Sequence, residues 1–411
     1  YNTARVHRVH AEVDGEAVAD ALRSIAARHV PLSWGYGTPR RHLTPDEAVE
    51  VEVGVEAMPI TELEAGSARR HRRPFDLENG PLLRGWVQPV DDGTTQILLA
   101  MHHVSGDALS FDRLWEQLDA ALHGRPEIEL PVDYATFTEW QRATRRDEEL
   151  AYWTPPSAGP PPARFAIHRP PVAEPDGYVD RTVSVSPEEL RHGTDVGGFA
   201  AALTAITAVL RAYADGDRMA TGFVASTRTH PDAAALSGYF LNTLPIELDA
   251  SPATSLRDLA ARAREVSGRH LANRTLPYAE IVAARREAGA TPPDLDVLMS
   301  FEELGDVSFG GAYVDHRVLF NGTAVADATF FIQPRSDRVD VGVEYRGSTV
   351  PAAVARRLLA DVDVALRTLV DAPDTNVGEL PLPSRTHAIR HGVDLAPPLP
   401  VVDSIRGNFD A

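Results

Sequence analysis

A proline-dense stretch before the midpoint of the chain limits the available folds more than any other feature. Residues 154–176 (TPPSAGPPPARFAIHRPPVAEPD) follow neither helical nor strand periodicity, and such a composition is typical of an extended connector. The chain has 411 residues, which is more than one ordinary hydrophobic core accommodates. We therefore expect two lobes of similar size, joined by this connector.

Strand-like and helix-like patterns alternate on both sides of the connector. Before it, we predict strands over 6–13 and 96–101 and helices over 16–29 and 108–122. After it, we predict strands over 181–185, 221–225, 295–301 and 339–345 and helices over 199–213 and 352–369. This alternation indicates an α/β protein. The expected boundaries are a first lobe over 1–153, the connector over 154–176, a second lobe over 177–384, and a linker or tail over 385–411.

Composition excludes several kinds of chemistry. The sequence has no cysteine, so disulfides, thiolate metal sites and a cysteine nucleophile are excluded. It also has no lysine, which excludes Schiff-base chemistry. The formal net charge of −19 opposes binding to a phosphate backbone, so nucleic acid is not an expected partner.

The hydropathy pattern does not predict insertion into a membrane. No apolar run reaches 18 residues, and the first residues do not have the basic and apolar sections of a signal peptide. We therefore expect no membrane partner and a cytoplasmic location.

The strongest local signal is the run HHVSGD, residues 102–107, where an apolar strand gives way to a helix. Strand alternation sends His102 and His103 to opposite faces, so only one of them points into a given channel while the other packs against its own lobe. Parity alone does not decide which. Asp107 stands where a helix N-cap is expected, which is an alternative to a functional role.

Other chemistries are less well supported by this run. A metal site needs histidines that converge, and the two neighbouring histidines diverge. Ser105 is not in a G-x-S-x-G elbow, so a serine hydrolase is disfavoured. The sequence also has neither a P-loop nor a G-x-G-x-x-G motif, so nucleotide chemistry has no support.

The run resembles the HHxxxDG motif of nonribosomal peptide synthetase condensation domains, which belong to the chloramphenicol-acetyltransferase-like superfamily. Further segments are similar to the blocks of that family and occur in the same order: RPFDLENGPLLR (73–84), DYATFTEWQR (133–142), GFVASTR (222–228), GYFLNTLP (238–245) and LPYAEIV (276–282). Together they cover nearly the whole chain. Three features depart from the family: Ala108 replaces the motif glycine, the usual opening segment is absent, and ADATFFI (326–332) replaces a late K-F-D-L-like run, a change that we expect at the lid over the channel.

The resemblance implies a fold of two chloramphenicol-acetyltransferase-like lobes that form a V-shaped pseudo-dimer with a central tunnel. Phosphopantetheine arms of donor and acceptor carrier proteins would enter from opposite ends, and the domain would hold no cofactor of its own. An adenylation domain is the expected neighbour in a larger synthetase. The implied product is an amide formed from two carrier-bound thioesters.

The resemblance also implies a role for each motif residue. His103 is the expected catalytic group, and His102 supports it. Asp107 is expected to pair with Arg228 and to tie the active-site loop to the second lobe. Three more residues are expected to line the tunnel or position substrate: Ser105, Gly106 and Asn242. For Asn242, a turn residue before Pro245 is an equally good interpretation.

Three other functions remain open at this point. An epimerisation domain shares the double histidine but needs a second acid or base across the tunnel, and none is evident. A non-catalytic condensation-like platform would recruit carrier proteins or tailoring enzymes, although such a platform has no need of the motif residues. An ester-forming relative would use an oxygen nucleophile, which the sequence does not distinguish from nitrogen.

Overall fold

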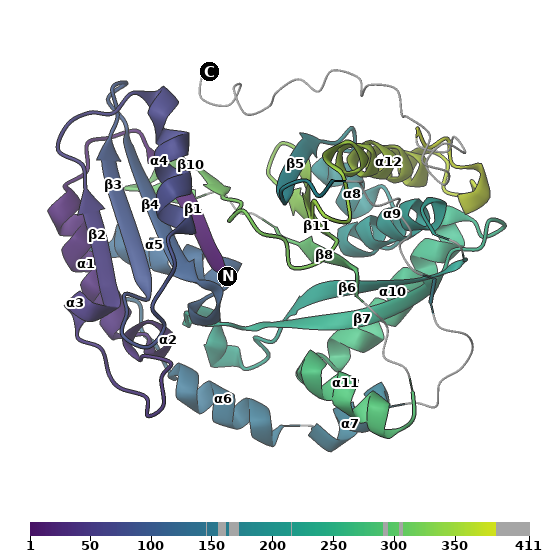
Figure 1. Cartoon of the computed structure of the whole chain (residues 1–411), viewed down its shortest axis with the longest axis horizontal. Helices are drawn as coiled ribbons and strands as arrows, with labels where there is room; N and C mark the ends of the chain where they lie inside the picture. Colours follow the sequence, from purple (N-terminus) through teal and green to yellow (C-terminus); the bar gives the residue numbers. More distant parts are fainter. Residues whose placement is uncertain are drawn as a thin grey trace. The chain divides into compact units, whose positions relative to one another are not determined.

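Figure 1 shows the computed structural model, which describes residues 1–144, 146–154, 162–163, 172–214, 216–290, 295–303 and 307–383. Most of the expected connector and the whole expected tail lie outside the described residues. The chain forms two compact units. Unit 1 comprises Tyr1–Thr144, Ser226–Leu241 and Asp306–Asn321, and unit 2 comprises Arg145–Ala225, Asn242–Gly305 and Gly322–Ala411.

Unit 1 is built on a sheet of six strands in the order β2-β3-β4-β1-β10-β9. The strands are β1 (Asn2–Val9), β2 (Val49–Val53), β3 (Leu83–Pro89), β4 (Thr95–His102), β9 (Val307–Phe309) and β10 (Ala312–Val318). The helices are α1 (Gly15–Ala27), α2 (Val30–Ser33), α3 (Pro45–Ala48), α4 (Ile60–Arg72), α5 (Ala108–Leu122) and α6 (Tyr134–Ala143), with 3-10 turns η1 (His103–Ser105) and η2 (Pro231–Ala235). β2 and β3 run parallel, and the other pairs are antiparallel.

Both faces of the unit 1 sheet are covered by helices. In β4, Leu99 packs into the core that α1 and α5 supply, whereas Leu98 packs with Leu63 of α4. Successive side chains of a strand point to opposite faces, so a strand buried on both sides is apolar throughout. This explains why the run QILLAM (96–101) has no alternation of apolar and polar residues.

Unit 2 has a second sheet of six strands, in the order β5-β12-β11-β8-β6-β7. The strands are β5 (Gly177–Thr182), β6 (Arg218–Ser226), β7 (Leu241–Asp249), β8 (Val297–Phe301), β11 (Ala328–Pro334) and β12 (Val339–Tyr345). The helices are α7 (Arg146–Trp153), α8 (Pro187–His192), α9 (Gly198–Ala212), α10 (Leu256–Ala272), α11 (Tyr278–Glu287) and α12 (Ala352–Asp371), with the 3-10 turn η3 (Val377–Glu379). Figure 1 shows α9 and α12 together beside this sheet, and both contribute to its core.

The predicted elements are mostly present, with shifted ends. Helix 108–122 and strand 339–345 have the predicted bounds. The first strand was predicted over 6–13 but occupies Asn2–Val9, because β1 pairs with β4 from Asn2 opposite His102 to Val9 opposite Thr95. The altered late segment 326–332 falls largely in β11, between β8 and β12, so it forms sheet rather than the expected lid.

The two units are not continuous in sequence, unlike the lobes that we expected. The hairpin β9–β10 comes from the late part of the chain and yet extends the unit 1 sheet by pairing with β1. Residues 226–241 also belong to unit 1, although the strands on either side of them lie in the unit 2 sheet. Helix α7 belongs to unit 2 rather than to the first lobe. Strand pairing over such long sequence separations leaves no local signal.

His29, just after α1, is a buried histidine that contacts residues 226–241. Its Nδ1 accepts a hydrogen bond from the backbone N–H of Ser237 at 3.4 Å, and its Nε2–H donates to Oε1 of Gln117 at 3.2 Å. Burial lowers the pKa of His29 to about 4. The native state therefore holds the imidazole neutral, because protonated Nδ1 cannot accept the bond from Ser237.

We expect this histidine to make the protein sensitive to acid. An unfolded histidine has a pKa near 6.5, so below that pH the unfolded state binds more protons than the native state. The free energy of unfolding then falls by up to about 1.4 kcal/mol per pH unit as the pH drops toward 4. Calorimetry at about pH 7.5 and about pH 5 should show a smaller fall in melting temperature for His29→Gln than for the unchanged protein.

The exposed His192 supplies the matched control. The melting temperature of His192→Gln should fall as far between the two pH values as that of the unchanged protein, because His192 is exposed and its replacement leaves the buried His29 in place. If the melting temperature of His29→Gln fell as far as that of the unchanged protein, His29 would not be a source of the acid sensitivity.

Candidate functional site

The two histidines lie at the junction between β4 and η1. His102 is the last residue of β4, and its Nδ1 accepts a hydrogen bond from the backbone N–H of Val104 at 3.2 Å. Burial is the largest cause of the lowered pKa of His102. His103 begins the 3-10 turn, and its backbone N–H donates to the carbonyl of Tyr1 at 2.8 Å.

The His103 ring is held in one tautomer. Its Nδ1 lies 2.8 Å from the carbonyl oxygen of Gly106. A carbonyl oxygen only accepts hydrogen bonds, so Nδ1 carries the proton in this contact. The neutral ring then has its lone pair on Nε2, which is the arrangement that a proton acceptor needs.

We expected one histidine to be packed into its own lobe, but both rings are partly exposed. The reason is local: β4 ends at His102, so strand alternation no longer controls the direction of His103. Sequence parity therefore did not apply to the second histidine.

Asp107 is the N-cap of α5. Its Oδ1 accepts hydrogen bonds from the backbone N–H of Ser110 at 2.9 Å and from the Ser110 hydroxyl at 2.7 Å. Its Oδ2 accepts from the backbone N–H of Phe240 at 3.3 Å. The carboxyl group is 2% exposed, so each of these bonds forms away from water. The cap predicted from sequence is confirmed.

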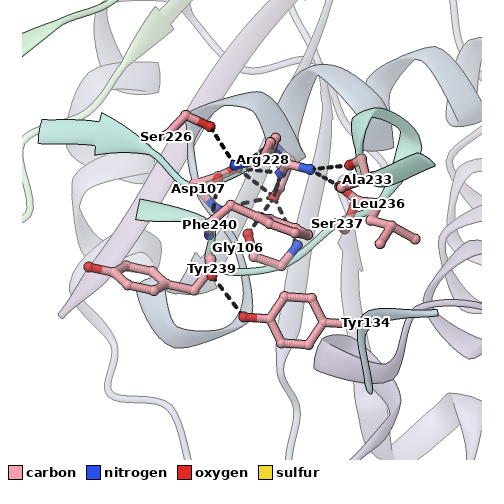
Figure 2. A network of polar contacts seen from close by, with 12 residues as sticks. Gly106, Asp107, Tyr134, Ser226, Arg228, Ala233, Leu236, Ser237, Tyr239 and Phe240 are labelled. Atoms are coloured by element: carbon pink, nitrogen blue, oxygen red, sulfur yellow. Dashed lines mark hydrogen bonds and ion pairs between the residues drawn. The ribbon is translucent and has the colours of Figure 1, made fainter. Parts of the chain in front are cut away.

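Arg228 completes this network, as Figure 2 shows. Its Nη2 lies 3.0 Å from Oδ1 of Asp107, and its Nη1 donates to the carbonyls of Ala233 and Leu236 at 2.8 and 2.7 Å. The guanidinium also stacks over the Phe240 ring at 3.7 Å from the ring centre. Burial lowers the pKa of Arg228, and the charge of Asp107 opposes that shift.

The ion pair that we predicted between Asp107 and Arg228 is therefore present, and it coexists with the helix cap. Its position differs from the prediction in one respect. Arg228 belongs to residues 226–241, which are part of unit 1, so the ion pair lies within one unit. It joins the histidine loop to a distant segment of sequence and does not tie it to the second lobe.

Ser105 and Gly106 are packed tightly within the turn that follows β4. Ser105 is fully buried, so its hydroxyl does not line a substrate surface as we had expected. A Cβ atom at Gly106 would lie 2.4 Å from Sδ of Met101 and 3.0 Å from Cβ of Ser110. Gly106 therefore allows close packing under the turn, while its carbonyl fixes His103. Ala108, which replaces the motif glycine, is simply the first residue of α5.

Asn242 lies in unit 2, in β7, where both its amide nitrogen and its amide oxygen make hydrogen bonds. Nδ2 donates to the carbonyls of Arg274 and Leu276 at 2.9 and 2.7 Å, and Oδ1 accepts from the backbone N–H of Tyr278 at 3.0 Å. The residue is 8% exposed. The interpretation of Asn242 as a turn residue was wrong, because it is a strand residue whose amide holds the segment before α11. Its role in lining a tunnel stays a prediction.

Sequence reasoning missed several residues of the network. Ser110 bonds the backbone N–H of Gly238 through its Oγ at 3.0 Å, and the Tyr134 hydroxyl donates to the carbonyl of Tyr239 at 2.7 Å. A local signal existed only for Ser110, because Asp and Ser three residues apart at a helix start form a capping box. The bonds from Ser110 to Gly238 and from Tyr134 to Tyr239 each join positions more than 100 residues apart.

The described ranges contain neither a cluster of metal-ligating side chains nor a helix that could span a membrane. No group of three His, Asp or Glu side chains within those ranges comes together as a metal-binding cluster. Among the helices described, none combines the length and apolar character needed to cross a bilayer.

Sequence comparison shows the family. The model of the Condensation domain family matches residues 1–388, and the chain belongs to this family. It is 29% identical to the phosphinothricin tripeptide synthetase PhsC of Streptomyces viridochromogenes over 95% of this chain and 39% of PhsC. It is 26% identical to the isonitrile lipopeptide synthase of Mycobacterium tuberculosis over 92% of this chain and 17% of that synthase. The chain thus spans well under half the length of these relatives.

Solved structures support the same fold. The condensation domain of the monacolin K polyketide synthase MokA superposes with a TM-score of 0.78 at 15% identity, over 92% of this chain and 94% of that one. The X-domain in its complex with OxyB from teicoplanin biosynthesis gives 0.73 at 18% identity, over 93% and 90%. The fold is the two-lobe, chloramphenicol-acetyltransferase-like α/β fold that we expected. The V shape and the tunnel stay predictions.

Replacement of Asp107 by Asn should destabilise the protein. The substitution leaves a buried guanidinium without its counter-charge, which costs about 3–5 kcal/mol. Denaturant unfolding should show this loss, and Arg228→Met combined with Asp107→Asn should cost less than the sum of the two single changes.

Asp20→Asn is the control, because Asp20 pairs with Arg23 on an exposed helix face. It should cost less than about 1 kcal/mol. If Asp107→Asn were as mild as this control, the buried pair would not hold the loop.

Replacement of Gly106 by Ala should also destabilise the protein, by about 1–3 kcal/mol, because the added methyl group overlaps Met101. Gly268→Ala on α10 is the matched control, since an added methyl group there meets open space. That change should stabilise by about 0.5–1 kcal/mol. Thermal unfolding measures both stability changes. An equal change in the two variants would show that the Met101 side chain moves to make room for the added methyl group.

Proposed function

We propose that this domain forms an amide bond between an acyl or peptidyl thioester donor and an aminoacyl acceptor, both bound to carrier proteins, in nonribosomal peptide biosynthesis. The observation that carries the proposal is the His103 ring, which is partly exposed and bonded through Nδ1–H to Gly106. Its Nε2 is thereby available to accept a proton. Membership of the condensation-domain family supports the same reaction class.

The reaction moves one proton from the amine to the departing sulfur, in two transfers through His103, and needs no redox step. The acceptor amine attacks the thioester carbonyl, a C–N bond forms, and the carbonyl π electrons move to oxygen. Nε2 of His103 accepts the ammonium proton from this tetrahedral intermediate. The C–S bond then breaks, and the departing thiolate of the donor arm takes that proton from Nε2 of His103, which restores the neutral imidazole and leaves the lengthened chain on the acceptor arm.

Positioning provides most of the acceleration in this proposal. An α-amine has a pKa near 7.7–8.0, so about one-sixth of it is already neutral at pH 7. Holding two tethered reactants together is worth about 7–11 kcal/mol, whereas a proton acceptor contributes about 10²–10⁴-fold. Asp107 and Arg228 serve the reaction indirectly, because they hold the loop that carries His103. His102 supports that loop through its bond to Val104.

The proposed partners follow from the substrates. Donor and acceptor carrier proteins would present their phosphopantetheine arms, and the domain would bind no cofactor of its own. The named relatives are much longer synthetases, which supports an adjacent adenylation domain in a larger protein. His103 is the only side chain that the proposal requires to react.

His103→Ala should lower the rate of amide formation by up to about 10²–10⁴-fold and leave a residual rate that comes from positioning. Intact-mass spectrometry of paired, loaded carrier proteins measures the product directly, as a mass increase on the acceptor. The assay compares the unchanged domain, His103→Ala, and a reaction without the domain.

His192→Ala, at an exposed histidine of unit 2, should react at the unchanged rate. If His103→Ala also kept the full rate, His103 would have no part in the chemistry. If the unchanged domain bound loaded carriers but produced no amide, the platform function would replace the proposed one.

A further inference from the structure

The turn Gly238–Phe240 is held from two sides by the network around Asp107. On one side, the Ser110 hydroxyl lies 3.0 Å from both the backbone N–H and the carbonyl of Gly238. On the other side, the backbone N–H of Phe240 donates to Oδ2 of Asp107 at 3.3 Å. The residue between these anchors is Tyr239, whose backbone is therefore fixed while its side chain remains 42% exposed.

Tyr134 of α6 provides a third anchor for the same turn. Its hydroxyl donates to the Tyr239 carbonyl at 2.7 Å, as Figure 2 shows. Its ring lies so close to Gly238 that a Cβ atom there would be 2.3 Å from Cε2 of Tyr134. Burial raises the pKa of Tyr134 to about 12, so the phenol keeps the proton that it donates.

The Tyr239 side chain, whose backbone these anchors fix, contacts the ring of His103. The ring centres of Tyr239 and His103 are 5.4 Å apart, with an angle of 79° between the ring planes. This is the edge-to-face geometry that aromatic pairs favour. Figure 2 shows the Tyr239 ring extending away from the Asp107–Arg228 pair rather than into it.

Two further contacts bear on the turn and the ring of His103. The 3-10 turn that carries it is closed by a 3.4 Å bond from the backbone N–H of Gly106 to the His103 carbonyl, which is long for a hydrogen bond. Tyr1 stacks on the ring at 5.0 Å between centres. The contact between Nδ1 and Gly106 therefore depends on neighbours that keep the ring in place.

We infer that Tyr239 is a positioning residue, whose ring packs edge to face with the His103 imidazole and keeps Nδ1–H on the Gly106 carbonyl, so that Nε2 stays the proton acceptor. The catalytic consequence rests on the proposed function. The positional role does not, because it follows from contacts within unit 1. It also explains why Ser110, Asp107 and Tyr134 all bond the same three-residue turn.

Tyr239→Leu tests this role because leucine keeps apolar bulk and removes the ring. Histidine-selective 15N NMR of the whole chain, with His103 assigned by its loss in His103→Gln, reports which ring nitrogen carries the proton. We expect the Nδ1–H form in the unchanged protein and a rise of the Nε2–H form in Tyr239→Leu. In the carrier-protein assay, the rate at saturating carriers should fall roughly 2- to 12-fold, the worth of one aromatic pair, with unchanged half-saturation.

Three further variants control the measurement. Tyr239→Phe keeps the ring and should behave as the unchanged protein in both readouts. Tyr313→Leu removes an exposed tyrosine of β10 and should leave both readouts unchanged. Tyr134→Phe loses only the bond to the Tyr239 carbonyl and should shift the tautomer in the same direction by a smaller amount, which keeps the test valid if Tyr239→Leu fails to fold.

The inference is overturned if Tyr239→Leu keeps the tautomer of the unchanged protein, or if Tyr239→Phe loses as much rate as Tyr239→Leu. The tautomer readout needs no carrier protein, so the two proposals fail separately. A shifted tautomer in Tyr239→Leu, together with no amide formed by the unchanged domain, would support the positional role and reject the proposed function.

Discussion

The buried ion pair between Asp107 and Arg228 is the interaction on which the candidate site depends. Taking two charges out of water is unfavourable unless each finds good partners. Here the carboxylate caps α5 and accepts from Ser110 and Phe240, and the guanidinium donates to two backbone carbonyls. The pair therefore fixes the start of α5, and with it the short turn that carries His103.

The same pair helps to hold a distant segment of the chain in unit 1. Residues 226–241 lie between two strands of the unit 2 sheet, yet they supply the guanidinium and the Gly238–Phe240 turn to unit 1. Phe137 of α6 and Phe240 pack in a small core of their own beneath this turn. Because these contacts span more than 100 residues, the site forms only when distant segments have already met.

The reaction proposed for His103 requires little catalytic apparatus. A single imidazole in a fixed tautomer suffices to move one proton when both reactants are tethered. The remaining polar groups nearby serve geometry: the Gly106 carbonyl orients the ring, and Ser110 anchors the turn opposite. Stability and reactivity are thus coupled through the same few hydrogen bonds.

The sequence by itself determined the α/β class, the motif at 102–107 and the cap at Asp107, because periodicity and capping chemistry are local. The pairing of Asp107 with Arg228 was implied only by the resemblance to a known family. Tertiary structure alone decided that Arg228 lies in unit 1, that β9–β10 completes the first sheet, that Asn242 is a strand residue bonded to the segment before α11, and that Tyr239 meets His103. Each of these depends on contacts between positions far apart in sequence, for which residue spacing carries no information.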